Sequence, residues 1–296
     1  MISKPLSKNG TVGLCAPCQI ADKYEYQLIG FQLRMMGFKV KMADNIYSSS
    51  YGYGASPEEK AEDFMQLIND DDVELILFGG GEGCNEVLPL LDYERIKEKP
   101  KRICAFSDST TLLNAIWANT GLETFYGLST SDFGMGLSEY NMKHFEGHIT
   151  SDDMTEHVPY SQWLICNDGV GEGILFGGYA RNVALMLGNK YFPIDKSQDY
   201  ILMIEDHEQF GTVDYVSAML AHIEQDEIME HIKGVIFGHY AIQRHPELYD
   251  RLQRLGRAHN IPVVYCDDFG HGETSAVFPI GHKARLDANE GKLTYL

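Results

Sequence analysis

The sequence predicts an α/β fold, in which the strands of a mostly parallel sheet alternate with helices. Two observations favour this fold. Short apolar runs alternate with amphipathic segments through the first half of the chain, and recognisable helix starts and stops fall between those runs. The chain has 296 residues, of which 44% are hydrophobic, so it can form one large α/β unit or two domains.

The first half of the chain contains four strand-like runs, each followed by a helical segment. We expect strands at 11–16, 38–42, 73–78 and 102–106, and helices at 24–36, 56–69, 84–91 and 109–120. Ser56 marks one helix start, because a serine oxygen caps free amides, Pro57 suits the first helical position and the acids that follow favour the positive end of a helix. Gly37 and Gly121 end two of the helices.

Residues 128–167 lose this periodicity and become a mixture of Gly, Ser, Asp and His, so we expect a linker there. It would separate an N-terminal domain, residues 1–127, from a C-terminal domain, residues 168–296. In the second domain we expect strands at 173–176, 200–204, 234–237 and 261–266, and helices at 182–187, 213–222 and 246–258.

The composition excludes several classes of partner. Asp and Glu total 43 against 24 for Lys and Arg, and a net charge of -19 repels nucleic acids and anionic membranes. The first ten residues contain no apolar signal-peptide core, and no run of 18 apolar residues occurs, so we expect a cytoplasmic protein with no membrane partner. Six sparse cysteines fit a reducing compartment, and Cys15 and Cys18, with no second CxxC pair, are interpreted as ordinary thiols.

Three residues that could carry chemistry each follow a predicted strand: Ser107, Glu205 and His271. In open α/β sheets the sites lie at the carboxyl ends of strands, so these side chains are able to converge on one crevice. A serine, a base and an acid are the parts of a hydrolytic triad, in which His271 would accept the Ser107 proton while Glu205 orients the imidazole. The strict G-x-S-x-G pattern of a nucleophile elbow is absent around Ser107.

Each of these residues also has a structural alternative. Ser107 is equally well explained as a plain helix cap. Taken singly, Glu205 is better explained as part of a solvated Glu-Asp-His-Glu loop, and His271 as a structural or exposed histidine between two glycines. The glycines after the strand at 73–78 fit no nucleotide-binding register, and no Walker lysine follows. We interpret Gly80 and Gly81 instead as residues whose backbone N–H groups approach a substrate carbonyl, as half of an oxyanion hole.

Metal binding has little support in the sequence. His144 and His148 are four residues apart but lack the H-E-x-x-H order, and we interpret them as surface polarity. Glu205, His207 and Glu208 are possible cation ligands, yet no neighbouring pair completes a set. We therefore expect a metal-free site and no cofactor.

Residues 102–127, RICAFSDSTTLLNAIWANTGLETFYG, resemble the nucleophile segment of the LD-carboxypeptidase family of serine peptidases. Further family motifs recur in the same order over nearly the whole chain: Ala16-Pro17, Tyr53-Gly54, Gly80-Gly81 with Asn85, 88–92 (LPLLD), Gly177-Gly178, 204–206 (IED), 269–272 (FGHG) and 279–281 (PIG).

The resemblance implies an N-terminal Rossmann-like domain, a C-terminal α/β domain with the active site between them, and a homodimer. It also implies a metal-free triad of Ser107, His271 and Glu205, with an oxyanion hole from the backbone amides of Asp108 and of Gly80 or Gly81. The implied reaction is release of the terminal D-alanine from murein tetrapeptides in the cytoplasm, so the partner would be a small peptide.

The sequence departs from the family pattern at Ala105, two residues before the nucleophile, and at Tyr179, after the Gly177-Gly178 pair. Residues 85–93 and 124–127 are more similar to the microcin-immunity branch, which hydrolyses acyl-nucleotide amides. Under that alternative Trp163 is a candidate to stack on the base, although the favoured interpretation of this residue is a packing aromatic. A third alternative is a catalytically silent peptide-binding protein. We expect an arginine, Arg181, at the substrate carboxylate.

Overall fold

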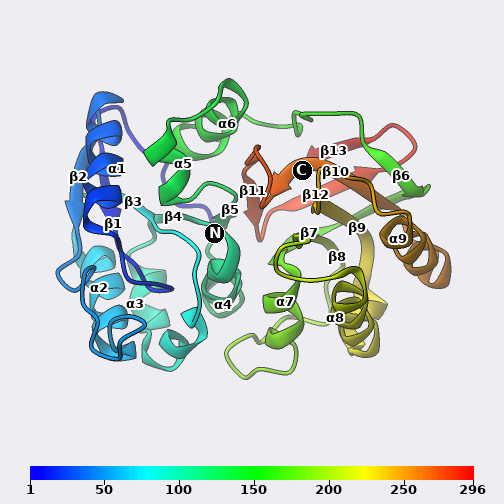
Figure 1. Ribbon diagram of the computed structural model, residues 1–296, viewed down its shortest axis with the longest axis horizontal. Helices are drawn as coiled ribbons and strands as arrows, with labels where there is room; N and C mark the ends of the chain where they lie inside the picture. Colours follow the sequence, from blue (N-terminus) through cyan, green and yellow to red (C-terminus); the bar gives the residue numbers. More distant parts are fainter.

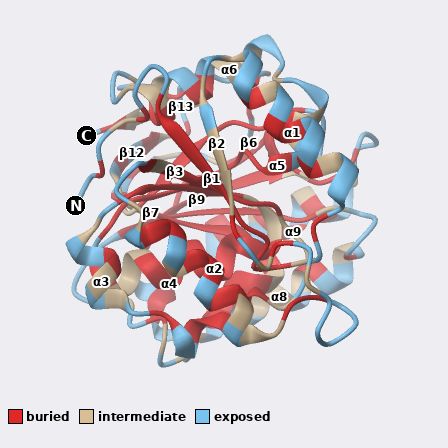
Figure 2. Cartoon of the chain, turned by 90° about the vertical axis from the view of Figure 1, so that its left-hand side faces the viewer, coloured by how far each residue is buried: buried red, intermediate tan, exposed pale blue.

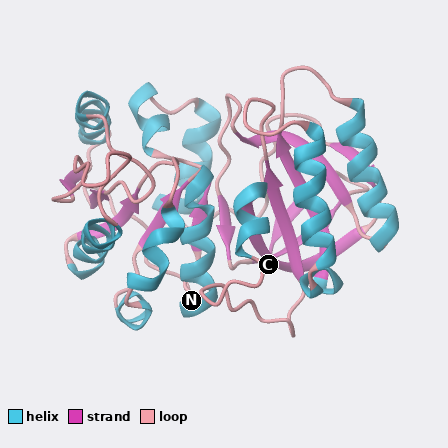
Figure 3. Cartoon of the chain, turned by 60° about the horizontal axis from the view of Figure 1, so that its bottom comes forward, coloured by secondary structure: helices cyan, strands magenta, loops and turns pink.

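The computed structural model describes residues 1–296, and its strands form two β-sheets that lie side by side with helices packed around each (Figures 1 and 3). The predicted α/β class, with a parallel N-terminal sheet and a second α/β unit, is confirmed. No helix combines the length and the apolar character that crossing a membrane requires.

The first sheet has the strand order β11-β5-β4-β3-β1-β2. Its five strands from the N-terminal half are parallel: β1 (Thr11–Leu14), β2 (Lys39–Met42), β3 (Val73–Leu77), β4 (Arg102–Ala105) and β5 (Thr124–Tyr126). The order 2-1-3-4-5 is the flavodoxin-like form of the doubly wound fold. The sixth strand, β11 (Phe278–Ile280), comes from the far end of the chain and pairs antiparallel with β5.

Helices α1 (Lys23–Met35), α2 (Pro57–Asn69), α3 (Tyr93–Glu98) and α4 (Thr110–Thr120) connect these strands. Ser56 caps α2 as predicted, since its hydroxyl accepts from the Glu59 amide and the Glu59 carboxylate accepts from the Ser56 amide. The helix predicted at 84–91 is instead a 3-10 helix, η1 (Cys84–Leu90). Pro89 lies inside it, and a proline removes the amide that an α-helical bond needs.

The segment 128–167 differs from the irregular linker that its composition predicted. It forms α5 (Thr130–Met135), α6 (Glu139–Phe145), a π-helical turn η3 (Glu146–Thr150) and β6 (Leu164–Asn167), which pairs with β10. The helices are short, so tertiary contacts rather than periodicity stabilise them. Phe133 and Phe145, for example, are both buried and pack edge to face with ring centroids 5.5 Å apart.

The second sheet has the order β13-β12-β7-β8-β9-β10-β6. Four central strands are parallel: β7 (Val170–Tyr179), β8 (Tyr200–Glu205), β9 (Ile232–His239) and β10 (Val263–Gly270). The antiparallel strands β12 (Lys283–Asp287) and β13 (Lys292–Tyr295) were not predicted. The helices are α7 (Ala180–Met186), α8 (Val213–Gln225), η4 (Glu227–His231) and α9 (Pro246–His259).

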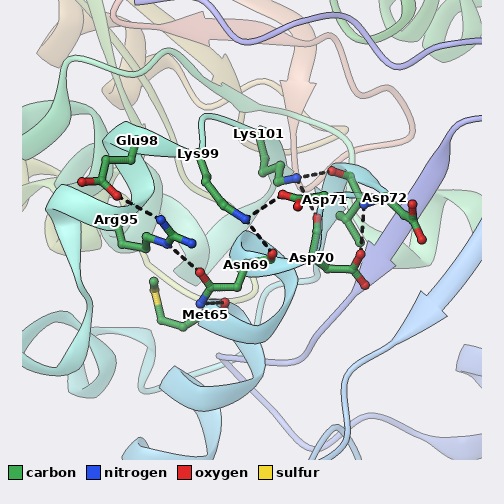
Figure 4. A network of polar contacts seen from close by, with 10 residues as sticks. Met65, Asn69, Asp70, Asp71, Asp72, Arg95, Glu98, Lys99 and Lys101 are labelled. Atoms are coloured by element: carbon green, nitrogen blue, oxygen red, sulfur yellow. Dashed lines mark hydrogen bonds and ion pairs between the residues drawn. The ribbon is translucent and has the colours of Figure 1, made fainter.

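The buried core runs through both sheets (Figure 2). The larger hydrophobic cluster holds 65 buried residues drawn from both halves of the chain, so the two sheets share one core. A polar network fixes the amino ends of β3 and β4, away from the crevice (Figure 4). There the Lys101 ammonium donates to the carbonyls of Asp70 and Val73, both at 2.7 Å, and Lys99 binds Asp71 at 2.6 Å.

Candidate active site

Ser107 lies at a sharp turn between β4 and α4, in the 3-10 segment η2 (Ser107–Ser109). Its φ of 63° is in the left-handed region, which is uncommon for a serine and costs free energy unless the surroundings hold it. This is the backbone conformation of a nucleophile elbow, although Ala105 stands where that motif has glycine. The turn therefore presents the hydroxyl beyond the end of the strand, and Ser107 is more than a helix cap.

The structure brings Ser107, His271 and Glu205 together in one hydrogen-bonded chain. Ser107 Oγ is 2.9 Å from His271 Nε2, and His271 Nδ1 is 2.8 Å from Glu205 Oε2. Glu205 ends β8 with no exposed surface, and His271 follows β10. Because the buried carboxylate accepts a hydrogen bond from Nδ1–H, Nε2 carries no proton in the neutral imidazole and remains an acceptor for the serine hydroxyl.

Tyr126, at the end of β5, is a member of this network that the sequence reasoning did not single out. Its hydroxyl donates to Glu205 Oε1 at 2.7 Å and accepts from the Ser107 amide at 3.2 Å. Burial, and then the Glu205 charge, raise the pKa of Tyr126, so the phenol keeps its proton. Its place at the carboxyl end of the strand beside β4 was the available signal.

The charges around His271 favour its protonated form. Burial opposes protonation, but the charge and hydrogen bond of Glu205, with a contribution from Asp206, raise the pKa of His271 above its usual value. Asp206 is itself buried, and its Oδ2 has no hydrogen-bond partner. Burial, opposed by a backbone hydrogen bond and reinforced by the Glu205 charge, raises the pKa of Asp206 to about 7.

The residues expected at an oxyanion hole border Ser107. A Cβ built on Gly80 would lie 2.6 Å from the Ser107 Cβ, so only a glycine allows the Gly-rich loop to approach the nucleophile this closely. Gly81 has a φ of 139° and packs on the Cys18 carbonyl. The Asp108 carboxylate accepts from the Cys84 amide at 2.8 Å and from Asn182 Nδ2 at 2.7 Å, which ties this loop and α7 to the turn after β4.

The contact between the two halves of the chain is built on α4 and the end of β7. Asn114 Nδ2 donates to the Gly177 carbonyl at 2.8 Å, and its Oδ1 accepts from the Gly177 amide at 3.1 Å. Thr110 Oγ1 accepts from the Tyr179 amide at 2.8 Å and donates to the Ser107 carbonyl at 2.7 Å. These bonds fix the turn that carries Ser107 relative to the sheet that carries Glu205.

His271 opens on a cavity of about 510 Å³ that is also lined by Tyr160, His207, His239 and Asp267. His239 Nδ1 is 2.8 Å from Asp267 Oδ1, and the exposed ring of Phe210 lies 4.9 Å from the His271 ring. A second cavity, of about 210 Å³, is lined by Asp108, the residue after the nucleophile, and by Glu82, Arg181 and Asn182.

The favoured interpretation of Trp163 is confirmed, whereas that of two histidines is wrong. Trp163 is 6% exposed and donates its indole N–H to Asp268 at 2.7 Å, so it is a packing aromatic and not a stacking platform in the crevice. His144 and His148 are buried, not surface polarity, because α6 and the π-helical turn fold against the core. Burial, and then the neighbouring His157, lower the pKa of His144 to about 3.

The chain offers one group of possible metal ligands: Cys18, Cys84 and Asp108, all buried, whose ligand atoms lie within 4.8 Å of one another. Both oxygens of Asp108 are already hydrogen-bonded, and the six cysteines are free thiols. Glu205 and Glu208 do not join in a ligand set, because Glu205 faces His271 whereas Glu208 contacts His245 at 3.2 Å.

A hydrogen-bonded serine, histidine and carboxylate at the strand ends of an α/β fold are typical of serine hydrolases. Two family models match the chain: the LD-carboxypeptidase N-terminal domain at residues 12–127 and the LD-carboxypeptidase C-terminal domain at residues 172–286. The chain therefore belongs to the LD-carboxypeptidase family, a family of carboxypeptidases.

Individual relatives agree with this assignment. The putative carboxypeptidase YocD of Bacillus subtilis is 29% identical over 88% of this chain and 86% of its own length. A probable murein peptide carboxypeptidase of the same species is 27% identical over 97% of this chain and 92% of its own. The crystal structure of an MccF-like protein from Bacillus anthracis has a TM-score of 0.91 and 26% identity, covering 100% of this chain and 99% of the other.

Proposed function

We propose that this protein is a metal-independent serine hydrolase that releases the terminal D-alanine from murein tetrapeptides by cleaving an LD-peptide bond. The observation that carries the proposal is the continuous hydrogen bonding from Ser107 Oγ through His271 to the buried Glu205, with Ser107 in a left-handed turn. Its relative named as a probable murein peptide carboxypeptidase supports the choice of substrate.

In the proposed mechanism His271 takes the hydroxyl proton as Ser107 Oγ attacks the scissile carbonyl carbon. The oxyanion accepts hydrogen bonds from the amides of Asp108 and of Gly80 or Gly81. The Ser107 amide is not available for this role, since it donates to Tyr126. His271 then protonates the departing D-alanine amine, and a water molecule activated by the same imidazole hydrolyses the acyl-serine ester. Glu205 holds the tautomer and stabilises the imidazolium.

The first test compares D-alanine release from a murein tetrapeptide by the wild type and by Ser107→Ala. Release by the wild type alone supports both the reaction and the nucleophile, whereas equal release by the variant refutes the assignment of Ser107. Circular dichroism of both proteins controls for folding. If neither protein releases D-alanine, the proposed substrate is wrong and the next assay uses an aspartyl-nucleotide amide.

That amide is the substrate of the second candidate function, a microcin-immunity-type amidase. The similarity to an MccF-like protein favours it, and so do two exposed aromatic residues near His271, Tyr160 and Phe210, which are 55% and 57% exposed. These rings replace Trp163 as the candidates for stacking on a base. Cleavage of the nucleotide amide without D-alanine release would select this function. A silent binding protein is disfavoured, because nothing in that role requires a 2.9 Å contact between serine and histidine.

We also propose that the chain forms a homodimer through α1. The outward side of α1 is exposed (Figure 2). Four apolar residues are exposed on this helix although they recur at the 4-3-4 spacing of a helix-packing seam: Tyr24, Leu28, Phe31 and Met35, exposed by 78%, 37%, 55% and 70%.

An antiparallel pair of α1 helices about a two-fold axis would join these apolar seams. It would also bring Glu25 opposite Arg34 of the partner subunit. Sedimentation should give a dimer for the wild type and a monomer for Phe31→Glu, with Leu90→Glu, at another exposed apolar site, as the control. Glu25→Arg should weaken the dimer and Glu25→Arg/Arg34→Glu should restore it. A dimer that survives Phe31→Glu refutes this interface.

A further inference from the structure

Arg181, in the first turn of α7, is a cation beside the candidate active site. Its guanidinium lies over the Tyr179 ring, 5.1 Å from the ring centroid, and the Tyr179 ring packs against His271 with centroids 5.3 Å apart. One aromatic ring therefore separates this charge from the base. Burial raises the pKa of Asp108 and of Asp206, and the charge of Arg181 acts in the opposite direction on both pKa values.

The partner of Arg181 is a carboxylate of the chain itself. A terminal nitrogen of the guanidinium donates to both oxygens of Glu82, at 2.9 and 2.8 Å. Glu82 belongs to the Gly-rich loop that borders Ser107, and Arg181 belongs to the other half of the chain, so this ion pair bridges the two halves beside the nucleophile. Both residues line the cavity of about 210 Å³ that Asp108 also lines.

The ion pair between Arg181 and Glu82 is accessible to another carboxylate that could replace Glu82. The Glu82 side chain is 74% exposed, and ion pairs at such sites contribute little stability. Glu82 stands between Gly81 and Gly83, with φ values of 139° and 86°, and its amide donates to the Cys18 carbonyl at 2.7 Å. The loop backbone is thus held in place, and exchange of the partner requires only rotation of the exposed Glu82 side chain. Lys60, a second basic residue beside this loop, is less accessible, because its side chain is 1% exposed and bound to Glu86.

A net charge of -19 makes the protein surface repulsive to an anionic ligand, so a substrate that ends in a carboxylate needs a local cation close to the scissile bond. We propose that Arg181 binds the C-terminal carboxylate of the substrate and that Glu82 occupies Arg181 in the free protein as an internal stand-in, which the substrate displaces. This inference rests on the proposed carboxypeptidase function. It identifies the subsite through which the enzyme would prefer a peptide with a free C-terminal carboxylate.

The test uses two ligands that differ only at the chain end: a murein tetrapeptide with a free terminal carboxylate and the same peptide as its C-terminal amide. Arg181→Gln should raise the KM for the acid roughly 10- to 100-fold, the loss of a charge-assisted hydrogen bond, and leave the KM for the amide unchanged. Glu82→Gln should lower the KM for the acid roughly two- to fivefold, since the competing carboxylate is removed.

The control is Glu172→Gln, which breaks an exposed pair with Arg285 at 2.8 Å on the second sheet and should leave both KM values unchanged. An equal effect of Arg181→Gln on acid and amide refutes the inference, as does a raised KM for the acid in Glu82→Gln. Calorimetric binding to Ser107→Ala separates this question from turnover. If the wild type releases no D-alanine but the acid still binds tighter than the amide in an Arg181-dependent way, the proposed function fails and the subsite stands.

Discussion

Removing the hydroxyl of Tyr126 is the most informative single perturbation of the network. Tyr126→Phe keeps the ring, which packs against Phe106 with centroids 5.3 Å apart, and deletes two hydrogen bonds. The lost bonds are the 2.7 Å donation to Glu205 and the 3.2 Å acceptance from the Ser107 amide. The substitution thus tests how the hydroxyl positions Glu205 and the turn at Ser107, while the packing of the ring stays unchanged.

The magnitude follows from what is left unpaired. Glu205 is fully buried, and after the substitution its Oε1 has no donor; an unpaired buried acceptor costs about 1–3 kcal/mol, and a charged one at least that much. If the transition state bears that whole cost, kcat/KM falls roughly 5- to 150-fold. Because Glu205 then interacts more strongly with His271, the pKa of His271 rises further. The base must be neutral to act, so the acid limb of the pH–rate profile should move to higher pH.

The assay is D-alanine release as a function of pH, with urea unfolding of the same proteins. Tyr200→Phe is the matched control, because Tyr200 is a buried tyrosine at the opposite end of β8 whose hydroxyl donates to the Asp195 carbonyl at 2.6 Å. The control should lose stability without a change in the pH profile. If Tyr126→Phe loses rate with no displacement of the acid limb, Tyr126 does not act through Glu205 and the reasoning is wrong.

Three further outcomes follow. Glu205→Gln should keep the fold and lower kcat by orders of magnitude, since the amide stabilises no imidazolium; a mild loss would transfer that role to Asp206. Because the native pKa of Asp206 is about 7, the folded protein keeps a proton that the unfolded chain releases at lower pH. The free energy of unfolding of the wild type should therefore fall by about 2–3 kcal/mol from pH 5 to 8, and Asp206→Asn should remove that fall in urea titrations. His144 should make stability fall toward low pH instead, because its native pKa of about 3 means that only the unfolded chain takes up a proton between pH 7 and 5. The free energy of unfolding should drop by about 2 kcal/mol over that range, and a pH dependence of stability that stays the same in His144→Gln would contradict this.

Local patterns were sufficient for the repeating part of the fold. Apolar runs and helix caps predicted β1 to β4 and the helices α1, α2 and α4, since these elements are specified by residues close in sequence. The strand β11 shows what such patterns omit: nothing within Phe278–Ile280 indicates that it pairs with β5, about 150 residues earlier, rather than with the second sheet. The short helices of 128–167 likewise depend on contacts that only the folded chain provides.

At the candidate site, strand ends located Ser107, Glu205 and His271, because a parallel sheet brings the carboxyl ends of its strands to one edge. Tyr126 and Asn114 were missed since their partners, Glu205 and Gly177, are 79 and 63 residues away and no local motif connects them. Composition also does not reveal which way an aromatic side chain faces, so the sequence favoured packing for Trp163 but left the stacking alternative open until the structure showed its indole N–H on Asp268.

The distance from Ser107 to His271 depends on how the two halves dock, since the nucleophile follows β4 of one sheet and the base follows β10 of the other. At the contact, a Cβ on Gly178 would lie 2.3 Å from Thr110 Oγ1, the atom that also binds the Ser107 carbonyl. A side chain at Gly178 would therefore push against α4 and Tyr126 of the other half, and its φ of 131° is itself unfavourable for any residue but glycine. Gly177 is required for a different reason, because a Cβ there would lie 1.8 Å from the Met203 carbonyl oxygen of the neighbouring strand β8. The proposed chemistry thus requires this pair of glycines, remote in sequence from the triad, once to build the second sheet and once to dock it against the turn that carries Ser107.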